Sequence, residues 1–341
     1  MNQIEFGRPM IGDEEKKAVL QVLDSPQLVH GPIAKLFEER FTDFIGGGYS
    51  TSTSSATTAL QLAYMVLGIG PGDEVIVTSF THIATANSIR AVGATPVFVD
   101  VELDTGNISI ESIRGAITSK TRAICIVHYL GIPVNMDGIL ALAKSHELAV
   151  VEDCALALGS TFKEVHVGLL GDFGAFSFYP AKHITTGEGG MLVSQNSSYI
   201  EEAMKIKAFY YSKGVGERKI PGQYDIVGFG LNLRMSEIAA AIGVEQLRKI
   251  REFLDAREDN AGILTQGFVS QKGSFISHNS PFGKSSYYCV AFILNSDYQK
   301  YREQLILNLK SLGIGTSIYY PISLPDSQFY RTNPEISRKI S

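Results

Sequence analysis

The sequence contains no tryptophan, only three cysteines, and no apolar run near the length of about 18 residues that crosses a bilayer. The cysteines, at Cys125, Cys154 and Cys289, are far apart, odd in number and form no CxxC pair. We therefore expect neither a disulfide framework nor a zinc site, and no metal in the functional site. The first residues lack the basic and apolar regions of a secretory signal, so we expect a cytoplasmic protein.

Charge of either sign is not in large excess. Lysine and arginine number 30 against 35 aspartates and glutamates, a formal net charge of −5 over 341 residues. The chain lacks the positive field typical of proteins that bind nucleic acid or anionic membranes, so we expect neither partner. Hydrophobic residues make up 45% of the chain and charged residues 19%, which is enough for a sizeable core. An anionic substrate would need local donors.

From residue 74 onward, short apolar segments alternate with amphipathic ones. We predict strands at 74–78, 95–99, 123–127, 148–152, 175–178 and 190–194. Helices are predicted between and before them, at 14–23, 33–44, 58–67, 83–92, 108–117 and 136–146. This alternation, with nearly continuous apolar strands, predicts an α/β fold in which helices flank both faces of a mostly parallel sheet.

The pattern changes after residue 236. We predict a long helical stretch with possible breaks, then a strand-like segment, a helix and a second strand-like segment, at 236–262, 287–294, 298–312 and 316–320. The change predicts a large domain over residues 1–245 and a smaller α+β domain over residues 246–341.

A lysine just past a predicted strand is the most informative residue. Lys182 lies in a loop that ends in the glycine-rich run 187–190, and Asp153 ends another apolar strand. A lysine amine can form a Schiff base with the aldehyde of pyridoxal phosphate (PLP), and a carboxylate can keep the pyridine nitrogen of that cofactor protonated. The simpler interpretations are a solvated loop lysine and an aspartate that caps a helix.

Three further segments could serve the same cofactor. The Ser/Thr-rich run 52–58 precedes a helix, where backbone amides can bind a phosphate, although such a run alone is more often an N-cap. His82 follows a buried strand and could stack on a pyridine ring or cap the next helix. Ser177 could reach the phosphate or bond the backbone. The order and spacing of these features along the chain favour the PLP interpretation.

These runs together resemble the DegT/DnrJ/StrS family, the sugar aminotransferases of PLP fold type I. The resemblance covers about residues 6 to 320 and rests on the runs 7–9, 54–57, 68–75, 84–87, 93–100, 152–153, 177–182, 187–190, 232 and 234–237. It implies an aspartate-aminotransferase-like large domain followed by a smaller C-terminal domain. Members usually continue past Tyr330 with further structure, whereas this chain ends at Ser341, which leaves the completeness of the small domain open.

The resemblance also implies roles for individual residues. Lys182 would form the Schiff base with the cofactor, Asp153 would pair with the pyridine nitrogen, and His82 would stack on the ring. The phosphate would be held by Ala56, Thr57 and Ser177, and by Asn232 from the neighbouring subunit of a homodimer with shared active sites.

The implied reaction is a transamination in amino-sugar and surface-polysaccharide biosynthesis, including lipopolysaccharide. Glutamate would give its amino group to the cofactor, leaving pyridoxamine phosphate (PMP), and a keto-sugar, most often nucleotide-linked, would then accept it. Lys182 would move the proton in both halves.

The chain departs from the usual family pattern at four positions. Glycine is usual where Ala56 stands, phenylalanine or tryptophan at His82, glutamine or histidine at Leu156, and histidine at Tyr319. Leu156 cannot make the usual hydrogen bond to the cofactor's ring hydroxyl. The changes at His82, Leu156 and Tyr319 indicate a subgroup with its own sugar.

Three alternatives to a nucleotide-sugar aminotransferase remain. A branch of the family removes a 3-hydroxyl from keto-sugars, but it carries histidine where this chain has Lys182; here His183 follows the lysine instead. A keto-octulosonate not linked to a nucleotide could be the acceptor. A non-catalytic regulatory relative is the third alternative, and the intact pair of Asp153 and Lys182 disfavours it.

Overall fold

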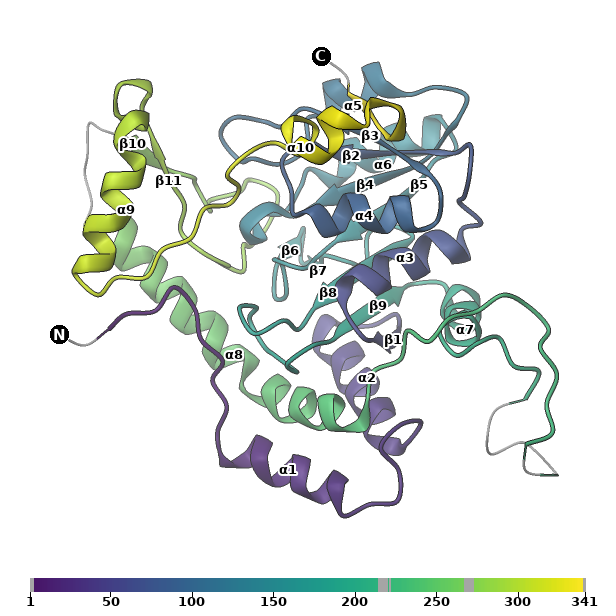
Figure 1. Ribbon diagram of the computed structural model, residues 1–341. Helices are drawn as coiled ribbons and strands as arrows, with labels where there is room; N and C mark the ends of the chain where they lie inside the picture. Colours follow the sequence, from purple (N-terminus) through teal and green to yellow (C-terminus); the bar gives the residue numbers. More distant parts are fainter. Residues whose placement is uncertain (1–2, 214–219, 221, 267–272, 340–341) are drawn as a thin grey trace.

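An eight-stranded sheet forms the centre of the computed structural model, which describes residues 3–213, 220, 222–266 and 273–339 (Figure 1). The strand order is β1-β9-β8-β5-β4-β2-β3-β12, and β9 is antiparallel to both of its neighbours while the other paired strands are parallel. The strands are β1 (Tyr49–Thr53), β2 (Glu74–Thr78), β3 (Thr95–Val99), β4 (Thr121–Val127), β5 (Ala149–Asp153), β8 (Phe173–Ser177), β9 (Gly190–Ser194) and β12 (Arg338–Lys339).

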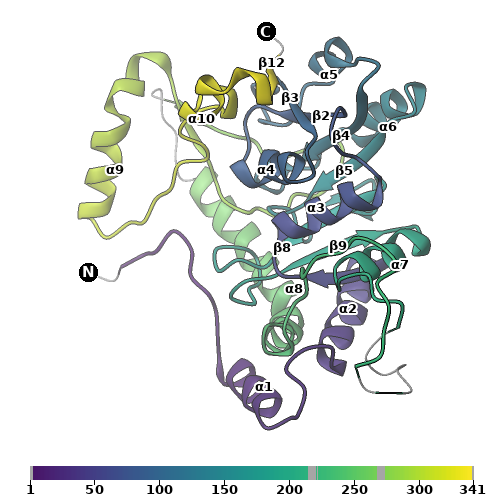
Figure 2. The same ribbon diagram turned by 45° about the vertical axis from the view of Figure 1, so that its right-hand side comes forward.

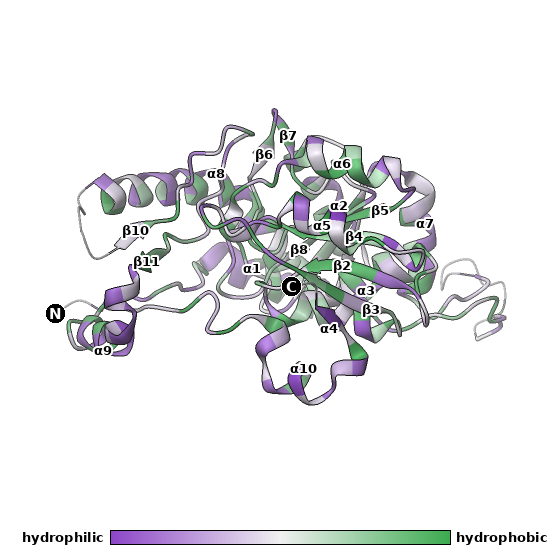
Figure 3. Cartoon of the chain, turned by 90° about the horizontal axis from the view of Figure 1, so that it is seen from above, coloured by the Kyte–Doolittle hydropathy of each residue, from purple (hydrophilic) through white to green (hydrophobic). Residues whose placement is uncertain are grey.

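Helices cover both faces of the sheet because the strands are apolar on both sides. Val75 and Val77 point to the face covered by α3 (Ala56–Val66), α4 (Ile83–Ala91) and α7 (Ser197–Ile206). Ile76, between them, points to the opposite face, as the two-residue period of a strand requires. That face packs against α2 (Pro32–Ile45), α5 (Ile110–Ala116), α6 (Met136–Ser145) and the first half of α8 (Glu237–Gln266). Figure 3 shows hydrophobic colour along the central strands.

The helix α8 connects the sheet domain to a smaller lobe. Its first half packs against α2 and α1 (Asp13–Leu23), and its second half runs toward the lobe (Figures 1 and 2). The lobe contains the hairpin of β10 (Gly273–Phe275) and β11 (Phe292–Leu294), the 3-10 helix η3 (Ser296–Tyr301) and α9 (Arg302–Ser311). A further hairpin joins β6 (Thr161–Phe162) to β7 (Val165–His166). Among the described residues, no helix combines the length and the apolar character that a membrane crossing requires.

The predicted α/β class is confirmed, and β2, β3 and β9 have the predicted bounds. Most of the other predicted strands and helices differ by a few residues at their ends, and three elements differ more. The stretch predicted with breaks over 236–262 is one continuous helix, α8, and only the last three residues of the strand-like segment 287–294 form a strand. Residues 316–320 form no strand, because their tyrosines pack into an aromatic cluster instead of pairing with a neighbouring strand.

The predicted domain boundary at residues 245 and 246 lies inside α8 and stays a prediction. The C-terminal part of the predicted small domain lies on the large sheet. Leu324 and Tyr330 pack into the core beneath α3 and α4, and β12 adds to the sheet beside β3. This part also contains η4 (Leu324–Asp326), α10 (Gln328–Thr332) and η5 (Pro334–Ile336).

Candidate active site

Asp153 ends β5 at the carboxyl edge of the sheet, where α/β folds bind ligands. Its side chain is 5% exposed, and each carboxylate oxygen accepts a hydrogen bond. Thr85 Oγ1 donates to Oδ2 at 2.8 Å and the Ala155 amide donates to Oδ1 at 3.0 Å. These two donors fix the orientation of the carboxylate, so Asp153 is suited to receive a cation at this edge.

Lys182 lies on a tight turn after β8. Its amide donates to the Tyr179 carbonyl at 2.8 Å, and the loop closes where the Thr186 amide donates to the Phe178 carbonyl at 2.9 Å. Burial lowers the pKa of Lys182 to about 8, while the nearby Asp153 and Cys289 act in the opposite direction. Lys182 therefore supplies an amine that is partly neutral near physiological pH, as imine chemistry requires.

The predicted phosphate loop forms the N-terminus of α3. Ser55 is the N-cap, and its hydroxyl accepts from the Thr58 amide at 3.2 Å. The amides of Ala56 and Thr57, in the first turn, have no partner within the helix and are available to an anion. Gly190 passes directly beneath: a Cβ there would lie 2.4 Å from the backbone of Ser55. The chain thus forms a close-fitting cradle at the helix end.

Ser177 lies beside this cradle, because it ends β8 and pairs with Gly190 across the sheet. It is half-buried, and its Oγ accepts from the Tyr179 amide at 3.4 Å. The structure therefore brings Ala56, Thr57 and Ser177 to one place, as a phosphate-binding role requires.

His82 is the N-cap of α4, where its Nδ1 accepts from the Ala84 amide at 3.2 Å. Burial lowers the pKa of His82, and the positive charge of Lys182 lowers it further. The ring centroid lies 6.2 Å from that of Tyr320. His82 therefore caps α4, and its ring lies beside Tyr320, while the charges of Lys182 and Asp153 shift its pKa in opposite directions.

Asn232 is exposed and follows an exposed apolar segment. It forms an isolated bridge with Ala208, and the carbonyl of the next residue, Leu233, accepts from the Ser54 amide at 2.9 Å. Its predicted contact with a neighbouring subunit's phosphate stays a prediction.

An aromatic cluster that the sequence did not predict surrounds Lys182. The Tyr288 ring lies beneath the lysine, with Nζ 5.2 Å from the ring centroid. The hydroxyls of Tyr288 and Tyr319 are 2.8 Å apart, and Tyr129 donates to the Tyr319 carbonyl. Phe80, Tyr320 and Leu156 complete the cluster. The departures from the family pattern at Leu156 and Tyr319 were signals of it in the sequence.

Glu152, next to Asp153, is fully buried and accepts four hydrogen bonds. The donors are the amides of Gly168, Leu170 and Gly171, at 2.7–2.9 Å, and Nε2 of His128 at 2.9 Å. His128 Nδ1 accepts from the Val134 amide, so the ring proton is on Nε2. In the described part of the chain, His128, Glu152 and Cys154 form a cluster of metal-ligand type. The nitrogens of His128 and the carboxylate oxygens of Glu152 already make hydrogen bonds within the protein. This cluster is therefore a structural hydrogen-bond network, here called the Glu152 network.

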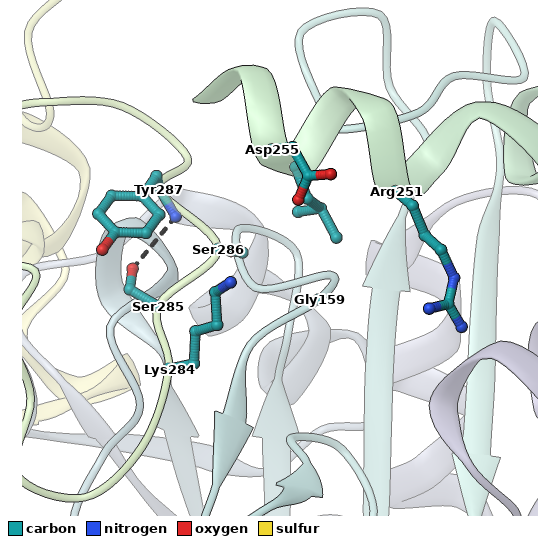
Figure 4. Close-up of a pocket in the computed structure, with 8 residues that line it drawn as sticks. Gly159, Arg251, Asp255, Lys284, Ser285, Ser286 and Tyr287 are labelled. Atoms are coloured by element: carbon teal, nitrogen blue, oxygen red, sulfur yellow. Dashed lines mark hydrogen bonds between the residues drawn. The ribbon is translucent and has the colours of Figure 1, made fainter. Parts of the chain in front are cut away.

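Two cavities are lined in part by α8. One of about 320 Å³ is lined by Lys182 and by residues of the N-terminal segment and α8, including Arg8, Gln246 and Arg257. The other, of about 180 Å³, is lined by Gly159, α8 and residues 284–287, with Asp255 and Lys284 at its sides (Figure 4). Neither is lined by Asp153, Ser177 or the N-terminus of α3, so neither cavity coincides with the cradle at the helix end.

The donor set fits PLP. A buried carboxylate suits the pyridine nitrogen, a lysine of lowered pKa suits the aldehyde, and the two amides that remain available at the N-terminus of α3, above a glycine, suit the phosphate. The fold and the site thus define the class of PLP enzymes of fold type I.

Comparison with known proteins identifies the family. The model of the DegT/DnrJ/EryC1/StrS aminotransferase family matches residues 9–340. GDP-perosamine synthase of Escherichia coli O157:H7 is 36% identical over 340 residues, which cover 98% of this chain and 90% of that protein. Spore coat polysaccharide biosynthesis protein SpsC of Bacillus subtilis is 35% identical over 324 residues, 93% of this chain and 83% of its own length.

A solved structure of a relative shows the same fold. The PMP form of the putative sugar aminotransferase Spr1654 from Streptococcus pneumoniae superposes with a TM-score of 0.91 at 29% identity, covering 96% of this chain and 88% of that one, and a PLP form of the same protein matches as well. The chain belongs to the DegT/DnrJ/EryC1/StrS aminotransferase family. The predicted family, fold class and enzyme class are confirmed.

Proposed function

We propose that this aminotransferase moves an amino group from glutamate to the ketone of a nucleotide-linked sugar, with Lys182 as the group that forms the imine and moves the proton. The cofactor is PLP, with PMP between the two halves of the reaction, in line with the two forms of the Streptococcus pneumoniae relative. The observation that carries the proposal is the presence of Lys182, its pKa lowered to about 8, near the buried and oriented Asp153.

Each residue of the candidate site would have its own role in binding the cofactor. Ala56, Thr57 and Ser177 would hold the phosphate at the N-terminus of α3. Asp153 would hold the ring nitrogen in its protonated form, because its carboxylate is fixed by Thr85 and Ala155. When bound, PLP supplies the electron sink that makes a proton next to the substrate nitrogen acidic.

Lys182 would carry that proton. With a pKa of about 8, its amine can accept a proton near neutral pH and release it again, which is the property that a shuttle needs. His82, at the start of α4, would cover the ring, and its own lowered pKa keeps it neutral, so it adds no positive charge beside the lysine.

The dehydratase alternative is disfavoured by the place of His183. His183 is 4% exposed, and its Nε2 lies 3.3 Å from the Ser286 carbonyl. The centroids of the His183 and Tyr288 rings are 5.7 Å apart. Burial holds the pKa of His183 well below its usual range. A histidine packed in this way cannot take over proton transfer at Asp153's edge of the sheet, whereas Lys182 can.

The sugar is proposed from the relatives. GDP-perosamine synthase names a nucleotide-linked amino sugar, and SpsC names polysaccharide biosynthesis. We therefore place the reaction in amino-sugar and surface-polysaccharide biosynthesis, in the cytoplasm where nucleotide sugars are made.

We further propose a homodimer whose active sites are shared. Residues 222–229 project from the sheet domain beside α7 and expose large apolar side chains (Figure 1). Ile226, Val227 and Phe229 are 64%, 60% and 74% exposed. Adjacent apolar residues of this kind mark an interface, and Asn232, which follows, would contact the second copy's phosphate.

An absorbance titration tests the enzyme function. Protein loaded with PLP should show a band near ~420 nm that moves to ~330 nm when glutamate is added, as the cofactor takes up the amino group. A GDP-linked 4-keto-sugar should then restore the first band. If glutamate produces no change while another amino acid does, the donor assignment is wrong. A 3-deoxy-sugar product would support the dehydratase instead.

A further inference from the structure

Tyr288 lies close to two cations. Lys182 Nζ is 5.2 Å from the centroid of its ring, and the guanidinium carbon of Arg257, on α8, is 6.0 Å from the same centroid. Both distances are within the range of cation–π attraction. The tyrosine is 3% exposed, so water does little to weaken the interaction. An amine near this ring is therefore attracted to it, and the attraction favours the charged form of the amine.

The ring is fixed from several sides. The Tyr288 amide donates to the Leu130 carbonyl at 3.1 Å, and its carbonyl accepts from Arg257 Nη1 at 2.7 Å. Its hydroxyl pairs with that of Tyr319 at 2.8 Å, and Tyr129 holds the Tyr319 backbone. The sheet domain, α8 and the C-terminal segment thus all hold one aromatic ring in place beneath Lys182.

We propose that Tyr288 is a positioning residue for Lys182: the face of its ring holds the lysine amine whenever that amine is not bonded to the cofactor, and the hydroxyl pair with Tyr319 keeps the ring in place. In a transaminase the lysine is released in each half-reaction and must stay within reach. This consequence rests on the proposed function, whereas the contact between ring and amine does not.

Other charged and titratable groups also act on Lys182. Asp153, from β5, and Cys289, beside Tyr288, favour its charged form. His82, from α4, and His183, from the same loop, are coupled to it as well. A test must therefore change the ring while leaving these groups unaltered.

The test measures the pKa of Lys182 in cofactor-free, full-length protein. The rate of acetylation by acetic anhydride is followed from pH 6 to 11 by peptide-resolved mass spectrometry, with exposed Lys144 as the internal reference. In Tyr288→Leu, loss of the ring should lower the pKa of Lys182 by about one unit. Tyr288→Phe keeps the ring face but loses the hydroxyl pair with Tyr319, and Tyr319→Phe loses the same pair. In both variants the pKa of Lys182 should fall between the native value and that of Tyr288→Leu.

A second series covers the case in which Tyr288→Leu does not fold. Position 288 is filled with phenylalanine and then with phenylalanines of increasing ring fluorination, which weakens the negative ring face with little change of shape. A stepwise fall in the pKa of Lys182 is expected. A pKa that stays constant along the series, or an unchanged value in folded Tyr288→Leu, overturns the proposal. Because no cofactor is present, failure here is distinct from failure of the transaminase function.

Discussion

Lys182 and Asp153 could be predicted from the sequence because each carries a local signal. Asp153 ends an apolar strand, and Lys182 lies in a glycine-rich loop after another. The parallel sheet then brings these strand ends to one edge. Thr85, which orients Asp153, lies 68 residues away; it belongs to the matching run 84–87, but nothing in that run indicates a contact with Asp153. Tyr288 was missed for the same reason, since only the folded chain brings it beneath Lys182.

At this scale the central prediction concerns Lys182. Lys182→Ala and Lys182→Arg should lower turnover by at least about 10²–10⁴-fold, because the first removes the amine and the second cannot lose its proton. Steady-state kinetics with glutamate and the keto-sugar measure this loss. Lys144→Ala, on the exposed surface of α6, is the matched control and should keep native activity. Substantial multi-turnover activity in either Lys182 variant would contradict the assignment.

Among the elements, the β2, β3 and β9 strands could be predicted because each is a short apolar run bounded by turn residues. The strand-like segment 316–320 could not, since its outcome depends on partners distant in sequence. Tyr319 and Tyr320 pack against Tyr288, Tyr129 and Phe80 instead of pairing in a sheet. Propensity gave the wrong element here because tertiary packing decided it.

The Glu152 network gives a prediction for stability. Glu152→Gln should lower the free energy of unfolding by about 2–4 kcal/mol, because an amide cannot accept all four hydrogen bonds and its NH₂ group would face donors. Chemical denaturation at pH 7 measures the change. Glu201→Gln, on the exposed face of α7, should cost almost nothing. Equal stability of the two variants would show that the four bonds contribute little.

The Glu152 network also predicts how the free energy of unfolding depends on pH. Burial alone would raise the pKa of Glu152, but His128 and the amides of Gly171 and Gly168 outweigh it and hold the pKa below the ordinary 4.5. A carboxyl with a lowered folded pKa stabilises the fold above its unfolded pKa, and that stabilisation is lost as the pH falls through the folded value. The difference in unfolding free energy between native protein and Glu152→Gln should therefore be largest near neutrality and shrink in acid. A difference that grows in acid would contradict this account.

At the scale of the whole molecule, the α/β class could be predicted from the alternation of elements, while the path of the C-terminal segment could not. Residues 324–339 return from the small lobe and add β12 to the large sheet. The strand has only two residues, Arg338–Lys339, and its pairing with β3 depends on contacts that include Arg338 donating to Glu74. Such a short strand has no periodicity to detect.

The dimer proposal gives the prediction for the assembly. The native chain should sediment as a dimer, and Phe229→Asp should shift it toward the monomer, because a charge replaces an apolar side chain that is 74% exposed in a single chain. Leu103→Asp, at another highly exposed apolar residue, should leave the dimer intact. Analytical ultracentrifugation of the three proteins decides the question. A native monomer across micromolar concentrations would remove the shared active site from the account.

The most direct test of the central claim locates the cofactor on the chain. Protein loaded with PLP is treated with borohydride, which makes a lysine-bound cofactor permanent, and the labelled peptide is then sequenced by mass spectrometry. The account predicts one phosphopyridoxyl group per chain, on Lys182. A label on any other lysine, or bound PLP that leaves Lys182 unmodified, would contradict it.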